Sequence, residues 1–254
     1  MLRRDLASGL EDYEWRRKTG KNSLPQVNKP YWDGAFAPGD RILFFGEQGF
    51  GDAIQFARYI PMIAKRCARV IVPCKPAVKR LIASVTAFAD NVDVRDEMFG
   101  RKEFEQYIPA MSAMRIFGTD MSTIPGDVPH LKAAPADVEK FRRIIRGGAK
   151  PGAWKIGIAW TGSPTNTISW KKTVNPTLFE RLMNEPAVEL YSLQKMRDDM
   201  PYAVKRVPAG VNDLATHLND FADTSAAIDC LDLVITVDTA VAHLAGALAK
   251  PVWR

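Results

Sequence analysis

The sequence predicts an α/β protein in which two successive halves each contain a mostly parallel sheet. Short apolar runs, typical of strands buried on both faces, alternate along the chain with segments of helical periodicity. Such alternation favours βαβ units, whose strands run parallel. The pattern fades in a proline-rich stretch at 121–135 and starts again at Trp154. The two halves are therefore expected to join near residues 147–152.

A helix and a linker are expected ahead of the first half. Residues 1–20 contain apolar side chains at an imperfect helical spacing, among them Leu6 and Leu10. The segment that follows is rich in Pro, Gly and Asn. It is expected to lie extended on a surface, with Trp32 and Phe36 as its anchors.

Each element of the first half follows from the spacing of its apolar residues and from the turn residues beside it. The run RILFFG is apolar almost throughout, as in a strand buried on both faces. A basic helix at the end of this half stops at a Gly-Gly pair. The expected strands lie at 41–46, 68–73, 92–95 and 107–109, and the expected helices run through 54–64, 76–85, 112–117 and 136–146.

The second half opens with the strand sequence WKIGIAW and repeats the alternation. The expected elements are strands at 154–160, 187–193 and 233–237, helices at 176–185, 224–231 and 239–249, a loop at 161–175, an irregular stretch at 196–212, and the start of a strand at 251–253. Because the sequence stops within an element, this half is expected to be incomplete.

Composition restricts the class to an ordinary globular protein. The 254 residues are 46% apolar and 25% charged, which argues against a disordered or fibrous chain. No segment approaches the roughly 20 apolar residues of a membrane span, and the charged start lacks the apolar core of a secretory signal. A cytoplasmic protein is expected, with reduced thiols at Cys67, Cys74 and Cys230, which show no C-x-x-C spacing.

The charge pattern is that of an ordinary solvated surface, and small phosphorylated ligands come next, ahead of nucleic acid. Lys and Arg number 35 against 29 Asp and Glu, which gives a net charge of +6. The basic residues are spread along the chain without a long block of like charges. No recognition motif accompanies them, so no nucleic-acid partner is expected.

Three strand-to-helix junctions carry polar groups where ligands bind in open parallel sheets, beyond the carboxyl ends of the strands. In the first, Gly46–Asp52, glycines let the backbone turn tightly and let a ligand come close. Asp52 fits two roles, helix cap and catalytic base, and the residues alone leave both open. The spacing differs from the G-x-G-x-x-G of dinucleotide sites, so no nicotinamide cofactor is expected.

The second junction follows the strand WKIGIAW. Thr161, Gly162 and Ser163 open it, and Lys171 and Lys172 come shortly after. Small hydroxyl residues, backbone N–H groups and a lysine suit phosphate oxygens. The spacing is not that of a P-loop, and an ordinary polar loop is the alternative.

The third junction is the sequence LVITVDTAVAH. Thr239 offers a hydroxyl and an N–H to an anion at a helix N-terminus, next to Asp238. His243 lies four residues further on, near the same helix face. The alternative is a capping Asp with a core histidine. His130 and His217 have no second ligand at metal spacing, so no metal site is expected.

Several segments resemble glycosyltransferase family 9, the heptosyltransferase-like family, in the version found behind tetratricopeptide repeats in bacterial proteins. They are EQGFGDAIQFARYIPMIA, IGIAWTGSPTN, YSLQK and DLVITVDTAVAHLAGALAKPVW. The resemblance covers roughly residues 40–254. The N-terminal GLEDYEWRRK is similar to the end of a final repeat helix.

The resemblance implies a GT-B architecture of two Rossmann-like domains and an inverting, metal-independent transfer. The sugar comes from a nucleotide-diphosphate sugar, a co-substrate, and no cofactor is implied. The implied domains are 1–40, a repeat remnant and linker; 41–147, the acceptor domain; and 153–254, the nucleotide-sugar donor domain, which is incomplete.

The resemblance also assigns residues. It implies that Asp52 is the general base, within an acceptor-side loop, and that the second domain binds the donor phosphates. The acceptor-side residues are Gln48, Gly49 and Gly51, and the donor-side residues are Thr161, Gly162, Ser163, Lys171, Lys172, Gln194, Asp238, Thr239, Ala240 and His243.

The expected partners are a nucleotide-sugar donor and a saccharide, lipid-linked or protein acceptor. A protein acceptor fits upstream repeats, whereas a lipopolysaccharide core acceptor, the family default, implies peripheral contact with the inner membrane. The alternative is a non-catalytic nucleotide- or protein-binding module, a truncated or degenerate relative of the enzymes.

Overall fold

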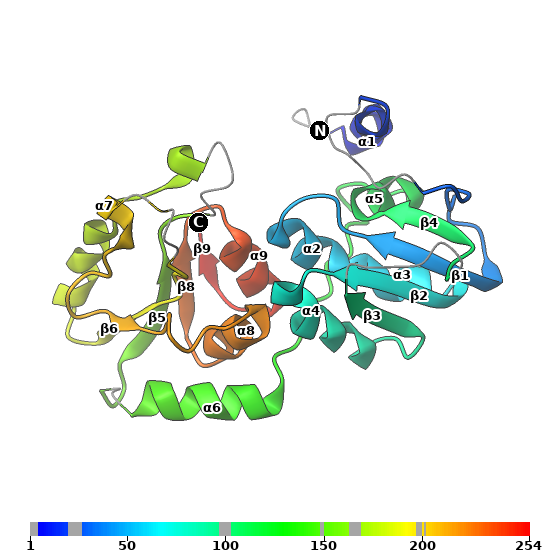
Figure 1. Cartoon of the computed structure of the whole chain (residues 1–254). Helices are drawn as coiled ribbons and strands as arrows, with labels where there is room; N and C mark the ends of the chain where they lie inside the picture. Colours follow the sequence, from blue (N-terminus) through cyan, green and yellow to red (C-terminus); the bar gives the residue numbers. More distant parts are fainter. Residues whose placement is uncertain are drawn as a thin grey trace. The chain divides into compact units, whose positions relative to one another are not determined.

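Two parallel sheets, one in each of two units, organise the chain (Figure 1). The units are Met1–Leu131 and Lys132–Arg254. All strand pairs named below are parallel, so the predicted α/β class is confirmed. The computed structural model describes residues 5–19, 27–96, 103–147, 150–162, 169–196, 200 and 202–254.

The sheet of the first unit has the strand order β3-β2-β1-β4. Its strands are β1 (Ala37–Phe45), β2 (Cys67–Cys74), β3 (Val92–Asp96) and β4 (Gln106–Pro109). In β1, every side chain from Ile42 to Phe45 is buried, because this strand pairs with β2 on one side and β4 on the other. The apolar run therefore marks an inner strand, as its sequence predicts.

Short helices connect these strands. They are α2 (Phe50–Phe56), η2 (Ala57–Tyr59), α3 (Ile60–Ala64), α4 (Pro76–Ala83), η3 (Ser84–Ala87), η4 (Ala110–Ser112) and α5 (Ala113–Ile116), where η denotes a 3₁₀-helix. The helix expected through 54–64 is thus divided by a 3₁₀ turn. Pro61 explains the division, because it has no N–H to continue the α-helical ladder.

The N-terminal segment belongs to the first unit. It forms α1 (Leu6–Tyr13) and η1 (Glu14–Arg17), and α1 packs against α5 (Figure 1). Trp32 is fully buried, and its indole N–H donates to the carbonyl of Ala35 at 3.0 Å, so its predicted role as an anchor is confirmed. The same prediction is wrong for Phe36, which is 71% exposed because it precedes the first residue of β1 and faces solvent.

The sheet of the second unit has the strand order β7-β6-β5-β8-β9. Its strands are β5 (Trp154–Ala159), β6 (Val188–Ser192), β7 (Asn212–Asp213), β8 (Leu233–Thr236) and β9 (Val252–Trp253). Its helices are α6 (Pro135–Arg146), η5 (Ser169–Lys172), η6 (Pro176–Asn184), α7 (Tyr202–Lys205), α8 (Phe221–Asp229) and α9 (Ala240–Ala247). The segment expected as a helix at 176–185 is a 3₁₀-helix, and the stretch expected to be irregular contains α7 and β7.

Helix α6 moves the boundary between the units toward the N-terminus. The sequence placed α6 in the first domain, which was expected to end at residue 147, whereas the compact units divide between Leu131 and Lys132. The reason is its apolar face: Val138, Phe141 and Ile145 are buried, and α6 packs against α8 of the second unit.

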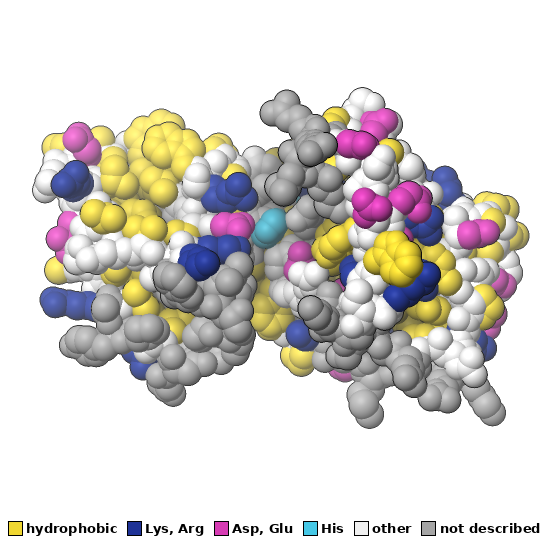
Figure 2. Space-filling view, turned by 90° about the horizontal axis from the view of Figure 1, so that it is seen from above, with side chains coloured by type: hydrophobic (Ala, Val, Ile, Leu, Met, Phe, Trp, Pro, Cys, Tyr) yellow, Lys and Arg dark blue, Asp and Glu magenta, His cyan; other side chains and the backbone are white. Residues whose placement is uncertain are grey.

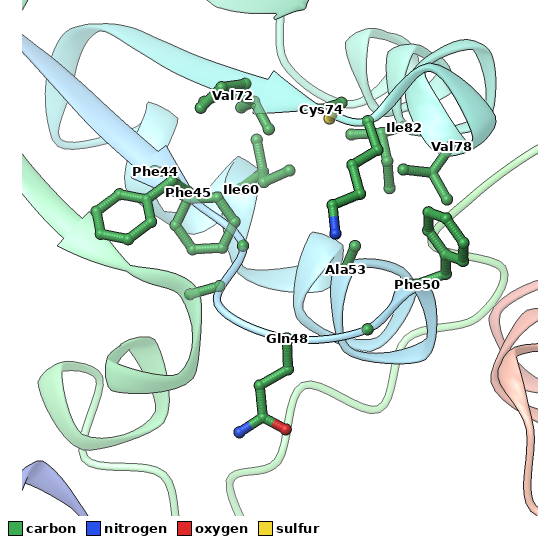
Figure 3. Close-up of a pocket in the computed structure, with 15 residues that line it drawn as sticks. Phe44, Phe45, Gln48, Phe50, Ala53, Ile60, Val72, Cys74, Val78 and Ile82 are labelled. Carbon is green, nitrogen blue, oxygen red and sulfur yellow. The ribbon is translucent and has the colours of Figure 1, made fainter. Parts of the chain in front are cut away.

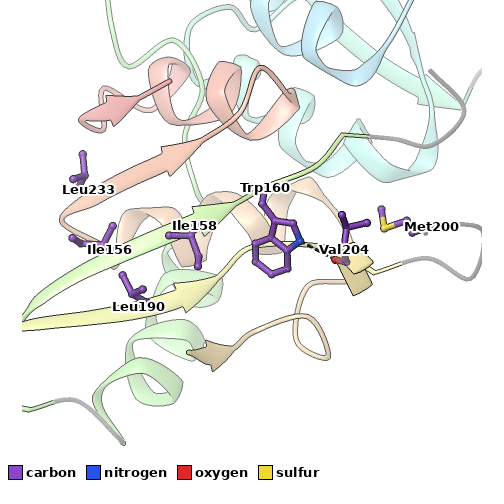
Figure 4. Close-up of a cluster of buried hydrophobic side chains, with 7 residues drawn as sticks. All are labelled: Ile156, Ile158, Trp160, Leu190, Met200, Val204 and Leu233. Carbon is purple, nitrogen blue, oxygen red and sulfur yellow. Dashed lines mark hydrogen bonds between the residues drawn. The ribbon is translucent and has the colours of Figure 1, made fainter. Parts of the chain in front are cut away.

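An apolar cluster packs against β5 and its two neighbours in the second sheet, β6 and β8 (Figure 4). It contains Ile156, Ile158, Trp160, Leu190, Met200, Val204 and Leu233. Trp160, fully buried, donates its indole N–H to the carbonyl of Val204 at 2.8 Å. This contact fixes the carboxyl end of β5, where the second polar junction begins.

Candidate functional site

The first junction lies between β1 and α2, and its backbone is fixed by Asp52. The N–H of Gly49 donates to Oδ2 of Asp52 at 2.9 Å, and Ala53 N donates to the carbonyl of Gly49 at 3.2 Å. These bonds close the first turn of α2, with Gly51 inside that turn. Capping is therefore one role of Asp52, and its half-buried carboxylate remains at the carboxyl edge of the sheet.

Glu47 is a member of this junction that the sequence interpretation missed. Its side chain is 1% exposed and pairs with Arg16, Nε to Oε1 at 2.9 Å and Nη2 to Oε2 at 2.9 Å. The N–H of Met111 donates to the same Oε2 at 2.9 Å. The available signal was a lone glutamate among glycines after a buried strand; its partner, 31 positions away, is not readable from spacing.

A cavity of about 350 Å³ opens beside this junction (Figure 3). Its walls come from the carboxyl ends of β1 and β2 and from α2 and α4, and they are mostly apolar. The lining residues are Phe44, Phe45, Gly46, Gln48, Gly49, Phe50, Ala53, Ile60, Val72, Pro73, Cys74, Lys75, Val78, Ile82 and Ala110. The Gln48 side chain turns away from this apolar wall, and its Nε2 donates to the hydroxyl of Tyr13 at 3.2 Å.

In the second unit, Lys172 and Asp238 form an ion pair. Lys172 Nζ lies 2.6 Å from Oδ2 of Asp238, and Arg254 Nη1 lies 3.5 Å from Oδ1. The hydrogen bond from Lys172 is the main cause that lowers the pKa of Asp238. Of the two lysines that the sequence left open, Lys172 is seen to contact the strand-end motif.

Gln194 and Thr161 also meet. Oε1 of Gln194, a buried side chain, accepts from Trp160 N at 3.2 Å and Thr161 N at 3.0 Å. The hydroxyl of Thr161 lies 2.7 Å from that of Thr173. Gln194 therefore ties the end of β5 to the end of β6. Gly162 follows directly, and Ser163 lies outside the described residues.

Thr239 caps α9, whereas the alternative interpretation of the sequence made the aspartate the cap. Its hydroxyl accepts from the N–H of Val241 at 3.3 Å and lies 3.3 Å from the hydroxyl of Thr236. Ala240 is the first residue of the helix, and the half-buried His243 stands on its first turn. The second and third junctions thus meet at one edge of this sheet, whereas Asp52 and its loop belong to the other unit.

On the face in Figure 2, acidic and basic side chains are interspersed rather than gathered by sign. Within the described ranges, no helix is long and apolar enough to cross a bilayer, and no group of three or more His, Cys, Asp or Glu side chains is arranged to hold a metal ion.

The chain has relatives of known sequence and structure, although no family model matches it. Over 98% of its length it is 25% identical to Protein FlbA from Caulobacter vibrioides, of which it spans 45%. A glycosyltransferase family 9 structure from Veillonella parvula superposes with a TM-score of 0.60 at 10% identity, covering 87% of this chain and 81% of that one. E. coli ADP-heptose lipopolysaccharide heptosyltransferase II gives 0.54 at 11% identity, with coverages of 84% and 83%.

A third solved structure is the iron-containing dodecameric glycosyltransferase TibC from enterotoxigenic E. coli. It gives a TM-score of 0.54 at 12% identity and covers 86% of this chain and 58% of its own. The fold is therefore the GT-B fold of the heptosyltransferase-like glycosyltransferases of family 9, as the sequence resemblance predicts. The chain spans less than half the length of FlbA.

Proposed function

We propose that this chain is a glycosyltransferase that moves a sugar, with inversion, from a nucleotide-diphosphate sugar to an acceptor hydroxyl. The observation that carries the proposal is the Lys172–Asp238 pair beside the Thr239-capped start of α9. It lies at the carboxyl edge of a parallel sheet, where such folds bind phosphorylated ligands. TibC has been solved with ADP-D-beta-D-heptose, which makes ADP-heptose the donor to test first.

The donor side is proposed to stabilise the leaving diphosphate. Negative charge grows on the phosphate oxygen as its bond to the sugar breaks, and a preorganised cation and N–H donors lower the free energy of that state. Lys172 supplies the cation, and the first N–H groups of α9, with the hydroxyl of Thr161, supply donors. Asp238 holds the ammonium of Lys172 in place until the diphosphate shares it.

The acceptor side is proposed to use Asp52 as the general base. The acceptor O–H gives its proton to the carboxylate while its oxygen bonds to the anomeric carbon, and the bond from that carbon to the diphosphate breaks. Because attack and departure occur on opposite faces, the configuration inverts. In this scheme neither a cofactor nor a metal ion takes part.

Three features of the proposal go beyond the donor. The acceptor is a saccharide, lipid-linked or protein hydroxyl, and the apolar cavity beside Gln48 is large enough to hold one apolar group of it. The location is the cytoplasm, with peripheral contact to the inner membrane for a lipid-linked acceptor. The domain roles are acceptor binding in the first unit and donor binding in the second.

The first test replaces Lys172. Lys172→Met should weaken ADP binding at least about tenfold, roughly 1.4 kcal/mol, because it removes the cation and leaves Asp238 to repel phosphate. Isothermal calorimetry measures the affinity, and ADP release from ADP-heptose measures turnover.

Lys140→Met is the matched control, since Lys140 of α6 pairs with Asp223 of α8 at 3.4 Å and neither residue belongs to the three junctions. It should bind ADP as the parent does. Equal affinity for all three proteins would place the nucleotide elsewhere. Tight binding without turnover would instead identify the non-catalytic nucleotide-binding module.

A further inference from the structure

The N-terminal helical segment reaches the acceptor-side loop through a buried charge. Arg16, in η1, is 8% exposed although it is charged. Its guanidinium holds both carboxylate oxygens of Glu47 and also donates to Ser112 Oγ at 2.8 Å and Glu14 Oε1 at 2.9 Å. A bidentate pair of this kind fixes the orientation of the guanidinium relative to the carboxylate as well as the distance between them.

Glu47 connects Arg16 to the acceptor-side loop, Gly46–Asp52, in which it lies. Its carboxylate joins three segments: η1 through Arg16, η4 through the N–H of Met111, and the junction in which it lies. Glu47 stands five residues before Asp52, and the turn between them is closed by the bond from Gly49 to Asp52. A shift of Glu47 would therefore move the start of α2.

Tyr13 makes a second contact to the same loop. Its hydroxyl accepts from Nε2 of Gln48 at 3.2 Å and donates to Sδ of Met111 at 3.4 Å. Burial is the main cause that raises the pKa of Tyr13, and the negative charges of Glu47 and Asp52 add to it.

We propose that residues 13–16 are a working part of the acceptor side: Arg16, through Glu47, positions the loop Gly46–Asp52, and Tyr13 orients Gln48. This rests on the proposed function, in which that loop serves the acceptor. A buried ion pair often adds little stability over an apolar pair of similar volume, and its two parallel hydrogen bonds hold the two side chains in one relative orientation. Arg16 is thus a positioning residue, and the segment is more than the remnant of a repeat helix.

The decisive variant exchanges the pair for apolar side chains, Arg16→Met with Glu47→Met. Its melting temperature should stay within a few degrees, because no unpaired charge remains buried. Backbone amides from Gly46 to Asp52 should exchange hydrogen at least about tenfold faster, since the loop opens more easily. The kcat for ADP release from ADP-heptose should fall about tenfold, with KM for the donor unchanged.

The control is another Arg–Glu pair of the first unit. Arg41, in the middle of β1, and Glu105, directly before β4, pair at 2.7 Å. Arg41→Met with Glu105→Met should leave exchange in the loop as it is. Arg16→Lys keeps the charge but loses the bidentate pair, and should give exchange between that of the parent and the double variant. Tyr13→Phe should speed exchange at Gln48 alone.

Hydrogen exchange tests the positioning role of Arg16 without a measurement of enzymatic activity. A failure of this proposal can therefore be told apart from a failure of the proposed glycosyltransferase function. Unchanged exchange from Gly46 to Asp52 in the double variant would overturn the positioning role. So would an equal increase in the Arg41 and Glu105 control. Faster exchange with an unchanged kcat would overturn the link between the loop and the reaction.

Discussion

The carboxylate of Asp52 has a structural role that is independent of any catalytic role. Its Oδ2 accepts from Gly49 at 2.9 Å and closes the first turn of α2. A cap and a base make different demands on the side chain: a cap needs an oxygen that accepts a hydrogen bond, and a base needs one that takes a proton. Replacement by asparagine keeps the first property and removes the second.

Asp52→Asn should therefore keep the melting temperature within a few degrees and reduce ADP release from ADP-heptose by roughly 10²–10⁴-fold. Asp137→Asn, in the first turn of α6, is the control and should turn over normally. Turnover near the parent level in Asp52→Asn would reduce Asp52 to a helix cap.

His130 is a buried histidine that contacts the backbone of α2. Its Nε2 lies 3.2 Å from the carbonyl of Ile54 in α2 and donates to it, because a carbonyl only accepts. Within the described part of the chain, its buried Nδ1 has no hydrogen-bond partner. Burial, with a smaller contribution from the charge of Arg58, lowers the pKa of His130.

This lowered pKa predicts an acid-sensitive first unit. The folded state disfavours protonation of His130, so its contribution to stability is present above the ordinary pKa of about 6.5 and is lost as the pH falls toward the lower folded value. The free energy of unfolding should decline over that window by up to about 1.4 kcal/mol per pH unit. Urea titrations monitored by exchange of amides in the first unit measure it.

His130→Gln should remove that slope, whereas His217→Gln, at an exposed position, should retain it. An identical pH dependence in the His130 variant would assign the slope to other groups.

At the scale of elements, α6 decides where one unit ends and the other begins. Its polar residues face solvent, and its buried stripe of Val138, Phe141 and Ile145 follows helical spacing. That stripe needs an apolar partner, and α8, buried along nearly its whole length, provides it. Spacing alone predicted the helix but did not say which sheet it covers.

Phe141→Ala should destabilise the second unit by about 3–5 kcal/mol, because a fully buried ring leaves a cavity against α8. Amides of α8 should exchange faster, while those of β1 and β2 should not change. Arg143→Ala, whose parent side chain is 78% exposed, is the control. Faster exchange in β1 would instead place α6 with the first unit.

At the scale of the whole chain, the two units repeat one design. Each has a parallel sheet whose central strand, β1 or β5, leads into a polar junction. In the second unit, Gly157 of β5 lets the side chains of Leu193 and Leu231 pack closely against the strand, since a Cβ at this position would lie 2.7 Å from atoms of each. The proposed donor and acceptor roles divide between these two units.

Much of this followed from the sequence because the signals are local. The apolar runs of β1 and β5 and the helical spacing of α6 and α9 each depend on neighbours a few positions away. Polar residues after three strands likewise predicted that polar groups gather at the carboxyl edge of each sheet.

Tertiary structure alone decided the contacts between distant segments. Arg16 contacts Glu47 across 31 positions, and Lys172 contacts Asp238 across 66. Both choices depend on which elements pack side by side, and a charged residue has many complementary partners in the sequence. The sequence therefore determined the elements and the edges where polar groups gather, whereas packing selected the partners, because the energy of an ion pair depends on distance and burial and not on separation along the chain.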